Sequence, residues 1–279
     1  DYYLATVKEA FNAGVIPRCH LEDITRADFY GFVVPFVNEL MELSHQAKIP
    51  VRIRACDTMG YGVPYTEVAL PRSVPGIVYG LQHYSGVESE YLEWHGHNDF
   101  YKAVANAATA WLYGASGVNC SMLGIGERTG NVDAITLAMN MYSHGVDPHL
   151  DFSNMPAICE VYERVTRMHV YERTPYAGAL VFAAFSGSHQ DAIAKGMTWR
   201  REKQLHQWTC PYIPIDPHDI GRTYDADVIR INSQSGKGGI GFLLQQNYGY
   251  NPPPKMREDL GYRVKDVSDH EHRELSVKE

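Results

Sequence analysis

The chain has 279 residues, of which 44% are hydrophobic and 21% are charged, so its composition is that of an ordinary globular protein. The formal net charge of −8 disfavours nucleic-acid binding, because a phosphate backbone requires a basic face on its partner. No run of about 18 apolar residues occurs and no secretory leader precedes the first element, so we expect neither a membrane span nor secretion.

The five cysteines are widely spaced, odd in number and form no CxxC pair. This usage predicts a reduced, cytoplasmic protein and argues against a disulfide framework or a cysteine-rich zinc site.

The first half of the chain alternates stretches of helical and strand periodicity. Helices are predicted over residues 2–14, 29–47, 70–83, 101–113 and 133–143. Strands are predicted over residues 16–22, 51–55, 92–97 and 117–122. Alternating strands and helices indicate a parallel sheet with crossover helices, which is an α/β fold.

Polar side chains follow directly after these predicted strands, as they do where a (β/α) barrel gathers its active site. The count of four or five strand–helix units is below the roughly eight that a closed barrel needs. We therefore expect a partial TIM (β/α) barrel that holds only the later strands, over residues 1–147.

The pattern changes after about residue 145. A helix is predicted over 154–168, a strand over 228–232 and a flexible glycine-rich loop over 233–241. Gly236-Lys237 lacks the strand and spacing of a phosphate loop, so nucleotide binding is disfavoured. We expect α+β post-barrel subdomains over residues 148–262 and a charged, frayed tail over 263–279.

The strongest local signal is the pair His95 and His97. Two histidines at i and i+2 of a strand face the same way and can bind one metal ion through neutral nitrogens. A hydrogen-bonded histidine pair without metal is the alternative, and a third, oxygen ligand has to come from elsewhere. The glycine-rich segment 124–131 can form a tight loop near such an ion, or an ordinary strand-to-helix turn.

Together, His95-Gly-His-Asn-Asp99 and Gly124-Ile-Gly-Glu-Arg-Thr-Gly-Asn131 resemble the acyl-CoA condensing enzymes of the DRE-TIM metallolyase superfamily. The segments after residue 145, among them the SGSHQD run and PYIPIDP, are similar to the post-barrel subdomains of 2-isopropylmalate synthases. The front half, with Arg18 to Asp23 and Arg54 to Gly60, looks more like the Re-citrate synthase branch.

The resemblance implies a Claisen condensation of acetyl-CoA with a 2-oxo acid, such as 2-oxoisovalerate to 2-isopropylmalate in leucine biosynthesis. It also implies a divalent metal, Mg, Mn or Zn, and a homodimer in which a subdomain reaches the partner's active site. A Re-citrate or homocitrate synthase, or an inactive truncated paralogue, are the alternatives.

The residue roles that the resemblance implies fall into three groups. The metal ligands are His95, His97 and Asn131. The catalytic residues are Glu22, which works with a histidine in proton transfer, together with His189 and Tyr224, which reach the neighbouring protomer's site. The substrate contacts are Thr58, which holds the 2-oxo acid carboxylate, and His20, which shares a strand face with Glu22.

The superfamily also carries an aspartate ligand and a catalytic arginine on its first barrel strand, and nothing before Glu22 resembles that motif. We expect the 279-residue chain by itself to be inactive or nearly so, and its incomplete sheet to have edges prone to association.

Overall fold

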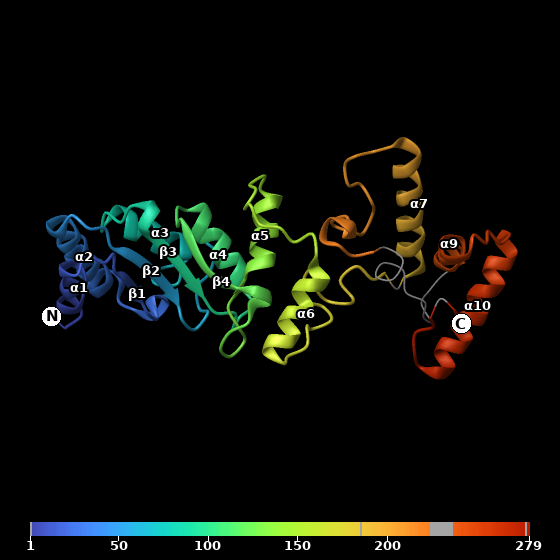
Figure 1. The fold of residues 1–279 in the computed structure, drawn as a ribbon, viewed down its shortest axis with the longest axis horizontal. Coiled ribbons are helices and arrows are strands. Elements are labelled where there is room, and N and C mark those ends of the chain that lie inside the picture. Colours follow the sequence, from blue (N-terminus) through green and yellow to red (C-terminus); the bar gives the residue numbers. More distant parts are fainter. Residues whose placement is uncertain (1, 185, 224–236, 277) are drawn as a thin grey trace. The chain divides into compact units, whose positions relative to one another are not determined.

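A computed structural model describes residues 2–184, 186–223, 237–276 and 278–279 (Figure 1). The chain divides into two compact units, Asp1–Leu150 and Asp151–Glu279. No helix among the described residues combines the length and apolar character that crossing a membrane requires.

The first unit is built on a five-stranded sheet in which every neighbouring pair of strands is parallel. The strands are β1 Arg18–Leu21, β2 Arg52–Asp57, β3 Leu92–Gly96, β4 Gly117–Ser121 and β5 Val132–Asp133. They lie side by side in chain order, which is the arrangement that strand–helix–strand units produce in part of a barrel (Figure 1). The expected α/β class is confirmed. The two-residue β5 escapes sequence analysis because it is too short to show a period.

Five helices accompany these strands, together with short 3₁₀ and π turns. The helices are α1 Tyr2–Asn12, α2 Val34–Ala47, α3 Val74–His83, α4 Ala103–Leu112 and α5 Ala134–Ser143. The turns are η1 Ile24–Arg26, η2 Phe29–Val33, η3 Ser89–Tyr91 and η4 Met122–Gly124. The helix expected from residue 70 begins only at Val74, because the Ser73 hydroxyl caps it by accepting a hydrogen bond from the Gly76 amide at 3.1 Å.

The two faces of the sheet differ in polarity. Ile53, Leu92 and Trp94 are fully buried in one core with side chains of the helices. The alternate positions carry Arg54 and Glu93, which are paired across β2 and β3. A parallel sheet covered by helices on both faces is apolar on both. Arg54 and Glu93 therefore mark the second face as the polar face of this sheet.

The described part of the second unit is helical. Its elements are α6 Met155–Thr166, α7 Gly187–Lys203, η5 Pro217–Ile220, α9 Lys237–Tyr248 and α10 Pro254–Glu271. The strand expected over 228–232 lies outside the described residues. The expected flexible loop is wrong for residues 237–241, which begin α9, and the expected frayed tail is wrong for 263–271, which continue α10.

Candidate active site at the carboxyl end of the sheet

Three loops meet where the parallel strands end. The His97 amide donates to the Asp57 carbonyl at 3.2 Å, which joins the ends of β3 and β2. The Asn98 amide donates to the Gly130 carbonyl at 3.0 Å, which joins the end of β3 to the segment 124–131. These backbone bonds bring the two motifs of the sequence, far apart in the chain, to one place.

The two histidine rings converge. Their Nε2 atoms lie 3.3 Å apart, and the rings meet edge to face with centroids 5.0 Å apart. The His95 Nδ1 atom lies 2.7 Å from the Asn119 Oδ1 atom, which only accepts a hydrogen bond. In the neutral tautomer that donates from Nδ1 to Asn119, the Nε2 atom of His95 presents a lone pair toward His97.

This geometry fits a shared divalent ion. Two nitrogens bound tetrahedrally at about 2.0–2.1 Å from one ion lie about 3.3 Å apart, which is the separation seen here. The same separation also fits the alternative, a hydrogen bond between the two rings. Burial, followed by the charge of Arg128, lowers the pKa of His97, so that its ring is neutral as a ligand must be. Asn119, at a position of β4 beside His95, is the kind of outer partner that a metal-binding histidine uses, and sequence analysis missed it.

Asn131 lies next to this pair through its backbone, in an isolated antiparallel bridge with His97. Its side-chain Oδ1 packs over Gly126, so closely that a Cβ on Gly126 would stand 1.8 Å from it. Gly126 therefore has to be glycine for the Asn131 side chain to keep its place. A ligand role for Asn131 stays a prediction.

Arg128 ties the 124–131 segment to the other loops. Its Nε donates to Asp99 Oδ1 at 2.9 Å, and its Nη2 donates to the Thr58 carbonyl at 2.5 Å. The hydrogen bond from Arg128 lowers the pKa of Asp99 and keeps the pair charged. Arg128 thus orders the loop, and the neighbouring Glu127 is exposed.

Glu22 and Thr58 are in direct contact. The Thr58 hydroxyl donates to Glu22 Oε2 at 2.9 Å and accepts a hydrogen bond from the Asp23 amide at 2.8 Å. A hydroxyl has a single proton, so Thr58 can donate either to Glu22 or to a bound carboxylate, but not to both. In this structure that proton is directed at Glu22 Oε2.

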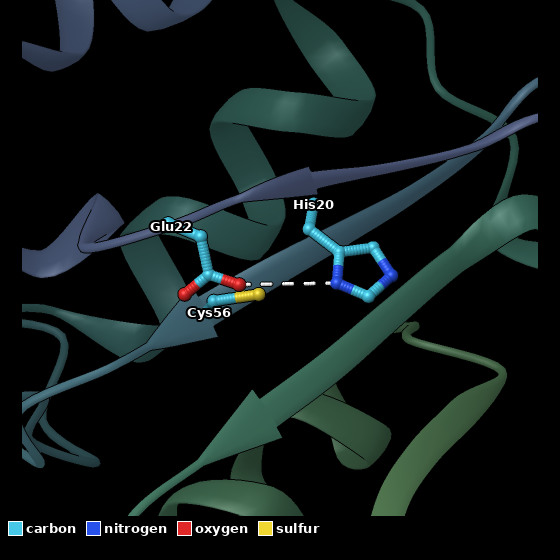
Figure 2. Close-up of side chains that lie close together, drawn as sticks. All are labelled: His20, Glu22 and Cys56. Carbon is cyan, nitrogen blue, oxygen red and sulfur yellow. Dashed lines mark ion pairs between the residues drawn. The ribbon is translucent and has the colours of Figure 1, made fainter.

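His20 and Cys56 flank Glu22 on the polar face, as Figure 2 shows. His20 Nδ1 lies 3.8 Å from Glu22 Oε1. Burial, followed by the positive charge of Arg54, lowers the pKa of His20. Burial and then the Glu22 carboxylate raise the pKa of the Cys56 thiol to about 12, so it stays protonated at neutral pH. Cys56 was not among the residues expected from the sequence.

The remaining expected site residues belong to the second unit. His189 is exposed on α7, where its ring stacks on Tyr212 with centroids 4.2 Å apart. Tyr224 lies outside the described residues. The structure places the first-unit residues together, while the roles assigned to His189 and Tyr224 stay predictions.

Polar side chains gathered at the carboxyl ends of parallel strands define an α/β protein with a barrel-type active-site end. A family described as HMGL-like matches residues 5–161, more than half of the chain, and a second, described as alpha-isopropylmalate synthase, post-catalytic domain-like, matches residues 179–245. The chain belongs to the HMGL-like family.

Three curated relatives are similar over most of the chain. The 2-isopropylmalate synthase of Helicobacter hepaticus is 58% identical over 76% of this chain, and that of Desulfitobacterium hafniense is 55% identical over 91%. The citrate (Re)-synthase of Clostridium kluyveri is 52% identical over 93%. The chain spans 38%, 44% and 54% of these relatives, respectively, so it corresponds to about half of their length or less.

Proposed function

We propose that this protein condenses acetyl-CoA with a 2-oxo acid, as an acyltransferase of the 2-isopropylmalate synthase type. The observation that carries the proposal is the 3.3 Å convergence of the His95 and His97 Nε2 atoms beside the bonded Glu22–Thr58 pair. The identity to 2-isopropylmalate synthases, at 55–58%, supports the reaction type.

Each group of site residues has a separate role in the proposed reaction. His95 and His97, with Asn131 as an oxygen ligand, would hold a divalent cation, Mg, Mn or Zn, which would supply Lewis-acid polarisation of the keto group. The Thr58 hydroxyl turns from Glu22 toward the 2-oxo acid carboxylate when that acid binds. Glu22 is then free to hold a histidine that removes a proton from the acetyl methyl group.

We assign that histidine to His189 of the partner subunit of a homodimer, and we assign Tyr224 to the same catalytic group. Replacing His189 by Asn is expected to abolish turnover and to leave bound metal unchanged, because His189 does not ligate the ion. Metal analysis and a CoA-release assay on the same preparation test this assignment, and a loss of metal in the variant contradicts it.

Two 2-oxo acids compete as the substrate. 2-Oxoisovalerate is favoured by the matched post-catalytic segment, and oxaloacetate is favoured by the 52% identity to a citrate (Re)-synthase over 93% of the chain. His20 lies near Glu22, with its Nδ1 atom 3.8 Å from Glu22 Oε1, which supports its assignment as a substrate contact.

The deciding experiment measures CoA release with 2-oxoisovalerate, oxaloacetate and 2-oxoglutarate, using the longest version of the protein that its gene encodes. Release with 2-oxoisovalerate alone supports a 2-isopropylmalate synthase, and release with oxaloacetate supports the Re-citrate alternative. No release with any of the three acids, from a folded and metal-loaded protein, overturns the proposal. We place the protein in the cytoplasm, which its free cysteines support.

A further inference from the structure

We propose that His20, Glu22 and Cys56 form a second cation site, distinct in its ligands from the histidine pair and selective for thiophilic divalent metals. One nitrogen, one carboxylate oxygen and one sulfur atom lie within 4.8 Å of one another. Figure 2 shows the three side chains turned toward a common point from β1, the loop after it and β2.

The strand register explains why the three meet. His20 pairs with Arg54 across β1 and β2, so Cys56, two residues further along β2, faces the same side. Glu22 lies two residues after His20, just beyond the end of β1. The backbone of the two segments therefore brings the three side chains to the same face, and only Cys56 among them is buried.

The distances are close to those of a three-ligand site with one open position. Donors around a tetrahedral Zn²⁺ with Zn–S about 2.3 Å and Zn–N or Zn–O about 2.1 Å are about 3.3–3.6 Å apart, so the cluster needs to contract by about 1 Å. The distance between His20 Nδ1 and Glu22 Oε1, 3.8 Å, is already close to this donor separation. Their side chains are 43% and 61% exposed, which leaves them room to rotate and gives an ion access.

The donor set decides which metal binds. A buried thiol becomes a ligand only by releasing its proton to solvent as the metal–sulfur bond forms, and thiolate favours Zn²⁺ or Cd²⁺ over Mg²⁺ or Mn²⁺. The guanidinium groups of Arg18 and Arg54 nearby oppose a cation, but both are bound to Glu93, at 2.9 and 2.7 Å. The thiolate and the Glu22 carboxylate together balance the charge of the ion.

A cation bound by His20, Glu22 and Cys56 would also affect the proposed active site. An ion that takes the Glu22 carboxylate competes with the Thr58 hydroxyl, which donates to it at 2.9 Å. A thiophilic metal is thus expected to inhibit the protein by removing Glu22 from proton transfer. This consequence rests on the proposed function, whereas binding of the metal does not.

The test is a titration of the 279-residue chain with Cd²⁺ alone, followed by ultraviolet thiolate-to-cadmium charge-transfer absorbance. We expect one equivalent of Cd²⁺ with this absorbance in the native chain and its loss in Cys56→Ser. Cys120→Ser, at an exposed cysteine of β4, is the matched control and is expected to keep it. Circular dichroism of each variant confirms that it is folded.

Two further variants keep the thiol and change only exposed ligands. Loss of an outer partner of a metal ligand already weakens affinity by about 10–100-fold, so His20→Gln and Glu22→Gln are each expected to weaken Cd²⁺ at least tenfold. Unchanged affinity in both variants, or unchanged absorbance in Cys56→Ser, overturns the site. The His95→Gln variant is expected to lose Mn²⁺ binding but to keep the cadmium absorbance. The cadmium site and the proposed function can therefore each be rejected without rejecting the other.

Discussion

At the scale of single residues, Asn119 shows how one side chain sets the chemistry of another. Its Oδ1 accepts the Nδ1 proton of His95 at 2.7 Å and so fixes the tautomer that exposes the Nε2 lone pair. Replacing Asn119 by Ala is expected to weaken Mn²⁺ binding by about 10–100-fold, measured by calorimetry. Asn119→Asp, which still accepts that proton, is the control, and equal loss in both variants contradicts the role.

Glu93 holds three arginines on the same face. Its carboxylate, 8% exposed, pairs with Arg54 at 2.7 Å, Arg18 at 2.9 Å and Arg52 at 3.6 Å. Replacing Glu93 by Gln leaves these guanidinium groups without their counter-charge, and we expect a loss of about 3 kcal/mol in the free energy of unfolding. Urea unfolding measures it, and Glu90→Gln, at an exposed position, is expected to stay within about 0.5 kcal/mol of the native chain.

The Glu93 carboxylate also makes the stability of the fold depend on pH. Burial acts to raise the pKa of Glu93, but the hydrogen bonds and charges of Arg54 and Arg18 outweigh it, and the pKa is lowered. Because the pKa of Glu93 is lower in the folded state, the ionised carboxylate stabilises the fold fully above the unfolded-state pKa of about 4.3. This stabilisation is lost as the pH falls through the folded-state pKa. The stability difference between native and Glu93→Gln protein is therefore expected to be constant from pH 7 to about 5 and to shrink at lower pH.

At the scale of elements, the 124–131 loop depends on one glycine. A methyl group at Gly126 collides with Asn131 Oδ1, because its Cβ would lie 1.8 Å from that atom. Gly126→Ala is expected to displace Asn131 and weaken Mn²⁺ binding, while the melting temperature changes little because Gly126 is exposed. Glu127→Ala, an exposed neighbour on the same loop, is the control. Native Mn²⁺ affinity in Gly126→Ala argues against Asn131 as a ligand.

At the scale of the whole molecule, the sheet ends at an edge. Among the described residues β1 pairs only with β2, and residues of β1 line a groove of about 650 Å³ together with residues of α1, η2 and α2. Tyr3, 70% exposed, borders this groove and contacts Phe36 with ring centroids 6.4 Å apart. An unpaired strand beside exposed aromatic rings is a template for association.

We therefore expect the 279-residue chain to self-associate as its concentration rises, and Tyr3→Lys to reduce this by placing a charge at the edge. Sedimentation at several concentrations measures the effect. Tyr65→Lys, which changes a tyrosine that is 61% exposed elsewhere, is the control. Equal association of the native chain and Tyr3→Lys protein shows that the contact lies away from the β1 edge.

Much of the fold was predictable because its signals are local. The alternation of strands and helices follows from periodicity within about ten residues, and the shared direction of His95 and His97 follows from their spacing on one strand. The two differences from the predicted elements also have local causes. Ser73 caps α3, which therefore begins at Val74 rather than at residue 70, and β5 has too few residues to show a period.

The sequence by itself determined the type and order of the elements and the two histidines that face one way, since each depends only on near neighbours in the chain. Only the tertiary structure decided what stands beside them: Asn119 behind His95, Arg128 on the Thr58 carbonyl, and Cys56 against Glu22. These contacts join residues from 24 to 70 positions apart, and their partners are set by the register of parallel strands. That register arises from packing of the whole sheet, which no single stretch of sequence contains.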